Sequence, residues 1–181
     1  GLAARFLFPK PRNFRNGHFR LVSTSNGAPT TEDIVSVLKR GMPGSSMPPW
    51  PNLKDDELRL LADYVVELRR TAIRDQERAL AAEGGYEATP EDIEKTVVQL
   101  TTPGPRIEGP EIGSGDAASI ERGKVLYLKS CASCHGMEGK GDGQQSMVDA
   151  EGVPARPRDL TSGIFKGNPD PASIYRRTLA G

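Results

Sequence analysis

The chain has 181 residues, with 24 basic and 24 acidic side chains, so its formal net charge is zero. This balance argues against nucleic acid as a partner, because binding to phosphates requires a surplus of basic side chains. Apolar residues make up 36% of the chain and it contains 20 Gly and 15 Pro, a loop-rich composition. No apolar run approaches the roughly 20 residues that span a bilayer, so we expect no transmembrane segment in this chain.

A loop rich in Pro and Gly is predicted from Gly41 to Trp50, and a helix is predicted after it. The loop places Met47 between prolines and glycines, where a methionine packs poorly as an ordinary core residue. Asp55 and Asp56 favour a helix start, and cations near position 70 favour its end, because these charges match the helix dipole. The apolar stripe of this helix consists of Leu58, Leu61, Ala62, Val65 and Leu68.

Residues 71–118 are predicted to form a linker with short helices and no chemistry of its own. Thr89 followed by Pro90 is typical of a helix start. Ile93, Val97 and Leu100 give that helix a thin apolar stripe. Residues 102–115 are rich in Pro and Gly, which favours an extended linker.

Residues 131–135 read Cys-Ala-Ser-Cys-His, and this motif carries the strongest functional signal in the chain. The pattern C-x-x-C-H is the c-type haem attachment signature, in which each thiol forms a thioether to one haem vinyl group. His135 would then bind the iron from one face. Cys131 and Cys134 are the only cysteines of the chain, so the motif accounts for both.

Three other kinds of site also contain closely spaced cysteines. A structural zinc site usually needs four protein ligands; only His18 is available to supplement the motif, and adjacent Cys134 and His135 do not easily bind one ion. A redox dithiol usually lies between a strand and a helix of a βαβ unit, and the surrounding sequence lacks that pattern. A lone disulfide is the third.

The segments on either side of the motif favour haem. Ser119 is predicted to cap a helix from about Ile120 into the motif, with Glu121 in its first turn. Residues 136–143 read Gly-Met-Glu-Gly-Lys-Gly-Asp-Gly, too rich in glycine for a helix and suited to wrapping closely around a flat ligand.

These parts together resemble a class I bacterial cytochrome c domain. The resemblance rests on Gly123-Lys124-x-x-Tyr127 before the motif, on the motif with Gly136, and on Gly141-Asp142-Gly143 after it. It implies an all-α, loop-rich cytochrome c-like fold around one covalent haem c. It also implies single-electron transfer, with histidine and usually methionine as the axial ligands of the iron.

An internal repeat links the two ends of the chain. The ten residues from Pro11 match those from Pro157 at a constant offset of 146 positions, with Pro, Arg, Gly and Phe coinciding. Further on, Ile34 matches Ile174 and Gly41 matches Gly181, at an offset of 140 positions. His18 aligns with an isoleucine, which indicates a structural or surface role for it.

The repeat predicts an unusual order of parts. Residues 1–70 correspond to the C-terminal part of a first cytochrome c domain, with the methionine loop and the last helix. Residues 119–181 correspond to the N-terminal part of a second one, with the haem motif. Two interpretations remain: a fragment of a longer di-haem protein, or two halves that face each other as one permuted unit. Gly1 to Pro9 are too short for a signal peptide and no initiator methionine is present, so we expect a processed or incomplete chain.

The resemblance assigns further roles, residue by residue. Met47 matches the axial methionine, for whichever haem it faces, with Met42 as the weaker candidate. Gly123 and Tyr127 match the first helix, and Leu61 and Tyr64 the last helix, of the pair that crosses in this family. Residues named as tentative partners of the haem or of its histidine are Arg12, Arg158, Trp50, Pro154 and Pro157, while Met137 and Met147 are expected to be packing or surface residues.

The predicted function is electron transfer by haem c, with iron cycling between the ferric and ferrous states, rather than enzymatic catalysis. The expected location is the periplasm or the extracytoplasmic face of a membrane. The expected partners are redox proteins, with membership of a membrane-associated respiratory complex as one setting. The alternative is a haem domain of a redox enzyme whose open sixth site performs catalysis or binds a gas.

Overall fold

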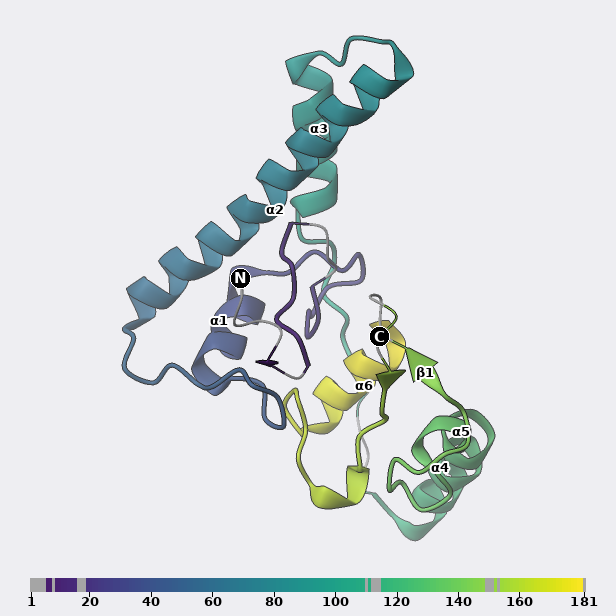
Figure 1. The fold of residues 1–181 in the computed structure, drawn as a ribbon. Helices are drawn as coiled ribbons and strands as arrows, with labels where there is room; N and C mark the ends of the chain where they lie inside the picture. The colour runs from purple at the N-terminus through teal and green to yellow at the C-terminus, as the bar shows by residue number, and fades with distance from the viewer. Residues whose placement is uncertain are drawn as a thin grey trace. The chain divides into compact units, whose positions relative to one another are not determined.

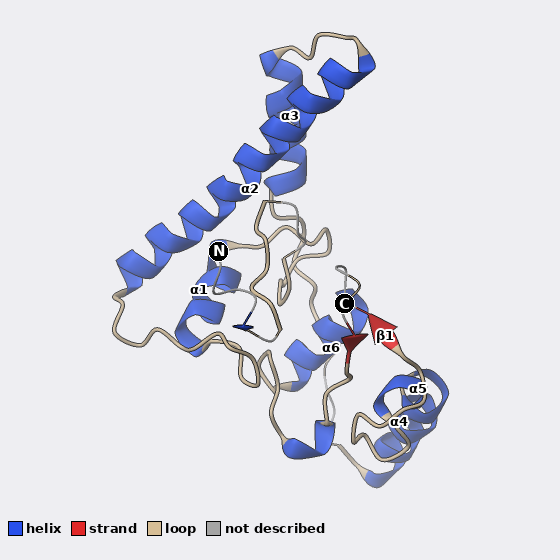
Figure 2. Ribbon diagram, in the orientation of Figure 1, coloured by secondary structure: helices blue, strands red, loops and turns tan. Residues whose placement is uncertain are grey.

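The computed structural model describes residues 6–7, 9–15, 19–109, 111, 115–148, 152 and 154–180. The fold is helical, as predicted, with one two-stranded sheet among the described residues (Figure 2). The chain divides into two compact units, one of Gly1–Gly109 with Lys166–Gly181 and one of Pro110–Phe165. The predicted domain limits at residues 70 and 118 divide the chain by the cytochrome c domain that each segment resembles. These limits stay a prediction. No helix in the described part of the chain is both long and apolar enough to cross a membrane.

In the first unit, α1 (Thr31–Arg40) packs against the start of α2 (Asp55–Gly84). A capping box begins α1, because Thr30 Oγ1 accepts the Asp33 N–H at 3.1 Å and Asp33 Oδ2 accepts the Thr30 N–H at 3.0 Å. The buried residues at this packing level are Ile34 of α1 and Leu58 and Ala62 of α2. The apolar stripe predicted for the start of α2 therefore faces the core only in part, and Leu61 stays exposed.

The helix α2 continues far beyond the end predicted near position 70. No Gly or Pro follows that point until Gly84 and Gly85, and Gly85 adopts the left-handed conformation that ends the helix. The arginines read as C-terminal cations lie mid-helix: Arg70 Nε donates to Thr101 Oγ1 at 3.3 Å, and Arg69 donates to the Arg15 carbonyl at 2.8 Å.

The second half of α2 forms a helical hairpin with α3 (Pro90–Thr101), visible in Figure 1 as the two helices that run side by side. The helix α3 begins as predicted, with Thr89 as the cap and Pro90 in the first turn. The core of the hairpin consists of Ile73 of α2 and of Ile93 and Val97 of α3. Arg74 joins the helices by ion pairs to Glu67 at 2.7 Å and Glu94 at 2.6 Å.

The stretch predicted as an extended linker is paired where it leaves α3. The Ser25 N–H donates to the Pro105 carbonyl at 2.9 Å, and the Ile107 N–H donates to the Ser23 carbonyl at 2.8 Å. Ile107 is buried. This part of the linker is therefore an integral part of the first unit.

The two copies of the internal repeat adopt matching local structures. The helix α6 (Pro171–Ala180) lies at the same offset of 140 positions from α1, and Asp170 caps it by accepting the Ser173 N–H at 2.9 Å. Asn13 accepts the Arg15 N–H at 3.0 Å, and its counterpart Asp159 accepts the Thr161 N–H at 2.8 Å.

The second unit holds α4 (Ala117–Ser130), α5 (Ala132–His135), the antiparallel strands β1 (Met147–Val148) and β2 (Pro154–Ala155), and the short 3-10 helix η2 (Leu160–Ser162). The helix α4 starts one turn earlier than predicted. Asp116 caps it by accepting the Ser119 N–H at 2.7 Å, because Ala117 and Ala118 are good helix formers.

Candidate functional site

The C-x-x-C-H motif occupies the junction between α4 and α5. The Cys131 N–H donates to the Tyr127 carbonyl at 2.8 Å, which completes α4. The Cys131 carbonyl then accepts the N–H groups of Cys134 at 3.2 Å and His135 at 2.9 Å. This turn holds both thiols and the imidazole on one short, hydrogen-bonded segment.

Both cysteines are free thiols, and both are partly buried. The structure shows no disulfide between Cys131 and Cys134. Cys134 Sγ lies 3.4 Å from Gln145 Oε1, and the Gln145 N–H donates to the Ser133 carbonyl at 3.0 Å. The described residues contain no group of three or more His, Cys, Asp and Glu side chains arranged to hold a metal ion. His18, the fourth candidate for zinc, lies outside the described residues.

The imidazole of His135 is oriented by a backbone carbonyl. Its Nδ1 atom lies 3.2 Å from the carbonyl oxygen of Arg158. A carbonyl only accepts, so Nδ1 carries the proton and Nε2 keeps a lone pair for a metal. The acceptor proposed from sequence was a proline carbonyl, at Pro154 or Pro157; the structure places it at the residue after Pro157.

The glycine-rich segment after the motif folds tightly against it. Gly136 and Gly141 have φ angles of 80° and 75°. A Cβ atom at Gly141 would collide with the Pro157 carbonyl, and one at Gly136 would collide with the Asp142 carboxyl group. The Gly141 N–H donates to the His135 carbonyl at 2.8 Å. Glycine is therefore required here for close backbone packing around the histidine.

Tyr127 connects α4 to this segment. Its hydroxyl donates to the Gly136 carbonyl at 2.7 Å. Burial raises the pKa of Tyr127, with smaller contributions from Cys131 and Asp142. The tyrosine had been matched from sequence to a helix crossing, and its bond to Gly136 was not foreseen.

The second unit has almost no apolar core of its own. Ala132 is the one buried apolar residue among its described residues. Its large apolar side chains are exposed, on α4 and on the segments after the motif, including β1 and η2. They are Ile120, Val125, Leu126, Leu128, Met137, Met147, Val148, Leu160 and Ile164. A unit this small needs a further apolar body to fold stably, and the free thiols and oriented imidazole fit a covalently attached haem.

Met47 and Trp50 lie in an ordered loop of the first unit. The Met42 N–H donates to the Met47 carbonyl at 3.1 Å, and the Trp50 N–H donates to the Leu38 carbonyl at 3.0 Å. Gly41 starts the loop with a φ of 68°, and a Cβ there would lie 2.7 Å from the Met47 carbonyl oxygen. Met47 is partly buried, and Trp50 is 48% exposed. Their assignment to a haem stays a prediction, as does that of the Arg158 side chain.

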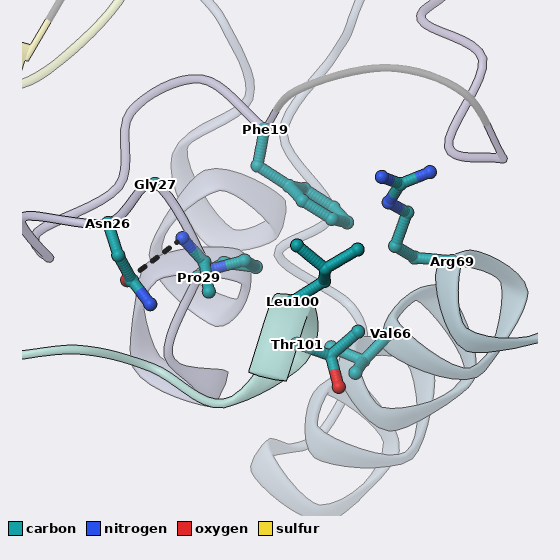
Figure 3. A pocket seen from close by; sticks show the side chains of 9 residues that line it. Phe19, Asn26, Gly27, Pro29, Val66, Arg69, Leu100 and Thr101 are labelled. Carbon is teal, nitrogen blue, oxygen red and sulfur yellow. Dashed lines mark hydrogen bonds between the residues drawn. The ribbon is translucent and has the colours of Figure 1, made fainter. Parts of the chain in front are cut away.

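The first unit also contains a cavity of about 120 Å³, shown in Figure 3. The Phe19 ring faces Leu100 across it, with Val66 and Arg69 from α2 alongside (Figure 3). Asn26 closes one side, because its Oδ1 accepts the N–H groups of Ala28 at 3.3 Å and Gly104 at 2.9 Å. These bonds tie the loop to the end of α3.

Comparisons with known proteins give two matches. The model of the cytochrome c family matches residues 120–181. Among solved structures, a chain of the Kuenenia stuttgartiensis reducing HAO-like protein complex Kustc0457/Kustc0458 is similar, with a TM-score of 0.71 and 31% sequence identity. The similarity covers 100% of this chain and 73% of that one. No curated protein matches the sequence.

Proposed function

We propose, because the chain belongs to the cytochrome c family through its residues 120–181, that it transfers single electrons through a haem c bound at Cys131, Cys134 and His135. When bound, haem c supplies an iron that cycles between the ferric and ferrous states. The observation that carries the proposal is the geometry at His135, whose Nδ1 faces the Arg158 carbonyl and whose Nε2 is therefore available to iron.

Each residue of the site has a distinct task in this proposal. The Cys131 and Cys134 thiols anchor the group through thioethers, and the Arg158 carbonyl fixes the histidine tautomer. The Arg158 guanidinium is the candidate partner for a haem carboxylate, because planar guanidinium and carboxylate groups form paired hydrogen bonds. The exposed apolar side chains of the second unit supply the surface that the flat group covers.

Covalent attachment of the haem is tested on the denatured chain. Haem that stays with the unfolded polypeptide is covalently bound. We expect this for the wild type and for Ser133→Ala, since Ser133 lies inside the motif without a role in attachment. The double variant Cys131→Ala, Cys134→Ala is expected to release its haem. Retention of haem by that variant would overturn the proposal.

We propose Met47 as the sixth ligand of a haem iron, with Trp50 nearby. Support comes from the ordered loop around Met47, whose carbonyl and N–H are both hydrogen-bonded, to Met42 at 3.1 Å and to Ser45 Oγ at 3.3 Å. A thioether ligand favours ferrous iron and raises the potential. In the alternative, the sixth site is open and the chain is the haem domain of a redox enzyme.

Spectroscopy of the reduced protein distinguishes these functions. A methionine-ligated low-spin spectrum that carbon monoxide does not change supports the electron carrier, whereas a high-spin form that binds carbon monoxide supports the open site. Met47→Ala is expected to abolish the low-spin spectrum if Met47 serves the haem on His135, and Met42→Ala is the matched control. An unchanged spectrum in Met47→Ala would overturn the proposal that Met47 is an axial ligand.

The internal repeat supports a tandem origin for the chain. The matching caps at Asn13 and Asp159, and the matching helices α1 and α6, are what two related domains would retain. The permuted unit gains support from exposed apolar side chains on both partner helices, Leu61 and Tyr64 on α2 and Ile120 on α4.

We further propose that the chain is an electron-transfer subunit of an extracytoplasmic redox complex. The support is its similarity, over its full length, to a chain of the reducing HAO-like protein complex. The native mass of the purified protein, together with the identification of any co-purifying haem protein, tests this assignment. Cell fractionation tests the location.

A further inference from the structure

A second cavity in the first unit is lined mainly by polar side chains and has a volume of about 340 Å³. It lies between the repeat-related helices α1 and α6, with the paired segments 21–23 and 106 also contributing to its wall. Its charged lining consists of Arg40, Arg106, Arg176, Arg177, Asp33 and Asp170. Four arginines against two aspartates give the wall a formal excess of two positive charges.

The two aspartates are engaged by helix caps. Asp33 Oδ2 accepts the Ser23 N–H at 3.0 Å, the Ser23 hydroxyl at 3.1 Å and the Thr30 N–H at 3.0 Å. Asp170 Oδ1 accepts the Ser173 N–H at 2.9 Å. These oxygens accept from backbone and hydroxyl donors, and the two carboxylates also interact electrostatically with Arg177 and Arg176. Two aspartates offset only two of the four arginines, so the formal excess of two charges remains.

Two of the arginines each donate a hydrogen bond to a backbone carbonyl. Arg176 Nε donates to the Ile107 carbonyl at 3.0 Å, and Arg177 donates to the Val22 carbonyl at 2.7 Å. A carbonyl orients a guanidinium without neutralising it, and each guanidinium carries five N–H donors. Burial lowers the pKa of Arg177, which shows the cost of holding this cation in the wall.

Arg40 and Leu21 each add an independent observation. Arg40 Nε is buried and has no hydrogen-bond partner among the described residues. An unsatisfied buried donor of a charged group is costly, and native proteins normally pair it.

Leu21 has a φ of 63°, a strained conformation for a branched side chain and the one such case among the described non-glycine residues. Strain of this kind concentrates at binding sites.

We propose that this cavity is a binding site for a small oxyanion, a phosphate or a dicarboxylate, held by Arg40 and Arg106 with Arg176 and Arg177. The anion satisfies the Arg40 Nε donor and neutralises the excess charge of the wall. The site is built from both copies of the repeat, from residues other than those assigned to the haem, and it is independent of the electron-transfer proposal.

Calorimetric titration of the haem-loaded protein at constant ionic strength tests the site, with inorganic phosphate and succinate as probes and sodium chloride as the reference salt. We expect saturable binding of one anion per chain. Tighter binding of phosphate identifies the phosphate class, and tighter binding of succinate identifies the carboxylate class. Absence of saturable binding for both probes overturns the proposal.

Three variants localise the binding. Arg40→Met is expected to weaken it by about tenfold or more, because a charge-assisted hydrogen bond is lost. Arg106→Met tests the same wall at a largely exposed side chain, so its effect does not depend on tolerance of a change at Arg40. Arg59→Met is the matched control, since Arg59 pairs with Glu32 at 3.3 Å away from the cavity wall. Equal affinity in all three variants overturns the proposal.

Discussion

The Nδ1 atom of His135 lies 3.2 Å from the carbonyl oxygen of Arg158, and this contact orients the imidazole that we propose as the haem ligand. The carbonyl reaches that position because Gly141 lets the backbone at Pro157 approach the glycine-rich segment. The orientation of the His135 imidazole is thus set by Arg158, 23 positions away, through its backbone carbonyl alone.

Gly141→Ala tests this support. The added Cβ would collide with the Pro157 carbonyl. We therefore expect the adjoining Arg158 carbonyl to shift away from His135 and the haem potential to change. The loss in the free energy of unfolding should be about 1–3 kcal/mol, the range for left-handed strain plus a steric clash. Voltammetry and denaturant unfolding measure the two effects.

Gly152→Ala is the matched control for that variant. Gly152 has the same φ of 75°, and a Cβ there would meet nothing within 4 Å. It should therefore lose stability through backbone strain alone and keep the wild-type potential. An equal change of potential in both variants would show that strain, and not the carbonyl contact, controls the haem.

Asp159→Asn tests an acid dependence at the cap of η2. The hydrogen bonds from Thr161 hold the pKa of Asp159 below its usual range. A lowered pKa stabilises the fold above the unfolded value of about 3.9, and that stabilisation is lost as the pH falls through the folded value. Asparagine already performs the same capping at position 13, so the variant should keep the turn.

The expected result is a flatter dependence of stability on pH below about 4 in Asp159→Asn than in the wild type. Unfolding in denaturant, followed by far-ultraviolet circular dichroism at several pH values, provides the measurement. The reciprocal variant, Asn13→Asp, should acquire such a dependence in the first copy of the repeat. If both variants match the wild type, a carboxylate at this capping position does not cause the acid dependence.

Tyr127→Phe tests the link between α4 and Gly136. Because burial raises the pKa of Tyr127, its neutral form is favoured in the fold. That stabilisation is present below the unfolded pKa of about 10 and is lost as the pH rises through the folded value. The variant should be less stable than the wild type at neutral pH and should lack this alkaline decline. If the stability of the variant and of the wild type declined in parallel at alkaline pH, the decline would belong to a titratable group other than Tyr127.

Val97→Ala and Val98→Ala form a matched pair in the helical hairpin. Val97 is 2% exposed and packs in the core with Ile73, whereas Val98 is 60% exposed. We expect Val97→Ala to lower the free energy of unfolding by about 2 kcal/mol. Val98→Ala should change it by less than about 0.5 kcal/mol. Similar losses would mean that the hairpin contributes little to the stability measured.

Sequence reasoning predicted most where a residue type determines a local conformation. Thr89 with Pro90 identified the start of α3, and the repeat anticipated equivalent local structure near Asn13 and Asp159. Sequence reasoning was wrong about helix ends that are set by the absence of a residue that breaks the helix. The helix α2 continues to Gly84 because nothing breaks it, and Asp116 takes the cap because the alanines after it extend α4.

The partner of His135 was beyond sequence reasoning for a different reason. Any residue supplies a carbonyl oxygen, so the identity of Arg158 contains no signal for this contact. The same holds for the cavity between α1 and α6, because its arginines are spread from Arg40 to Arg177 and only tertiary packing gathers them. Surplus glycine near the motif was the one visible trace of close backbone packing.

The near absence of buried apolar side chains in the second unit has a consequence for the stability of its fold in dilute solution. A core completed by a dissociable ligand would disperse whenever the ligand concentration fell below its dissociation constant. The proposed thioether bonds at Cys131 and Cys134 would make the haem part of the same molecule, so its local concentration would no longer depend on supply. Such a unit, once matured, should have a melting temperature that is independent of protein and haem concentration.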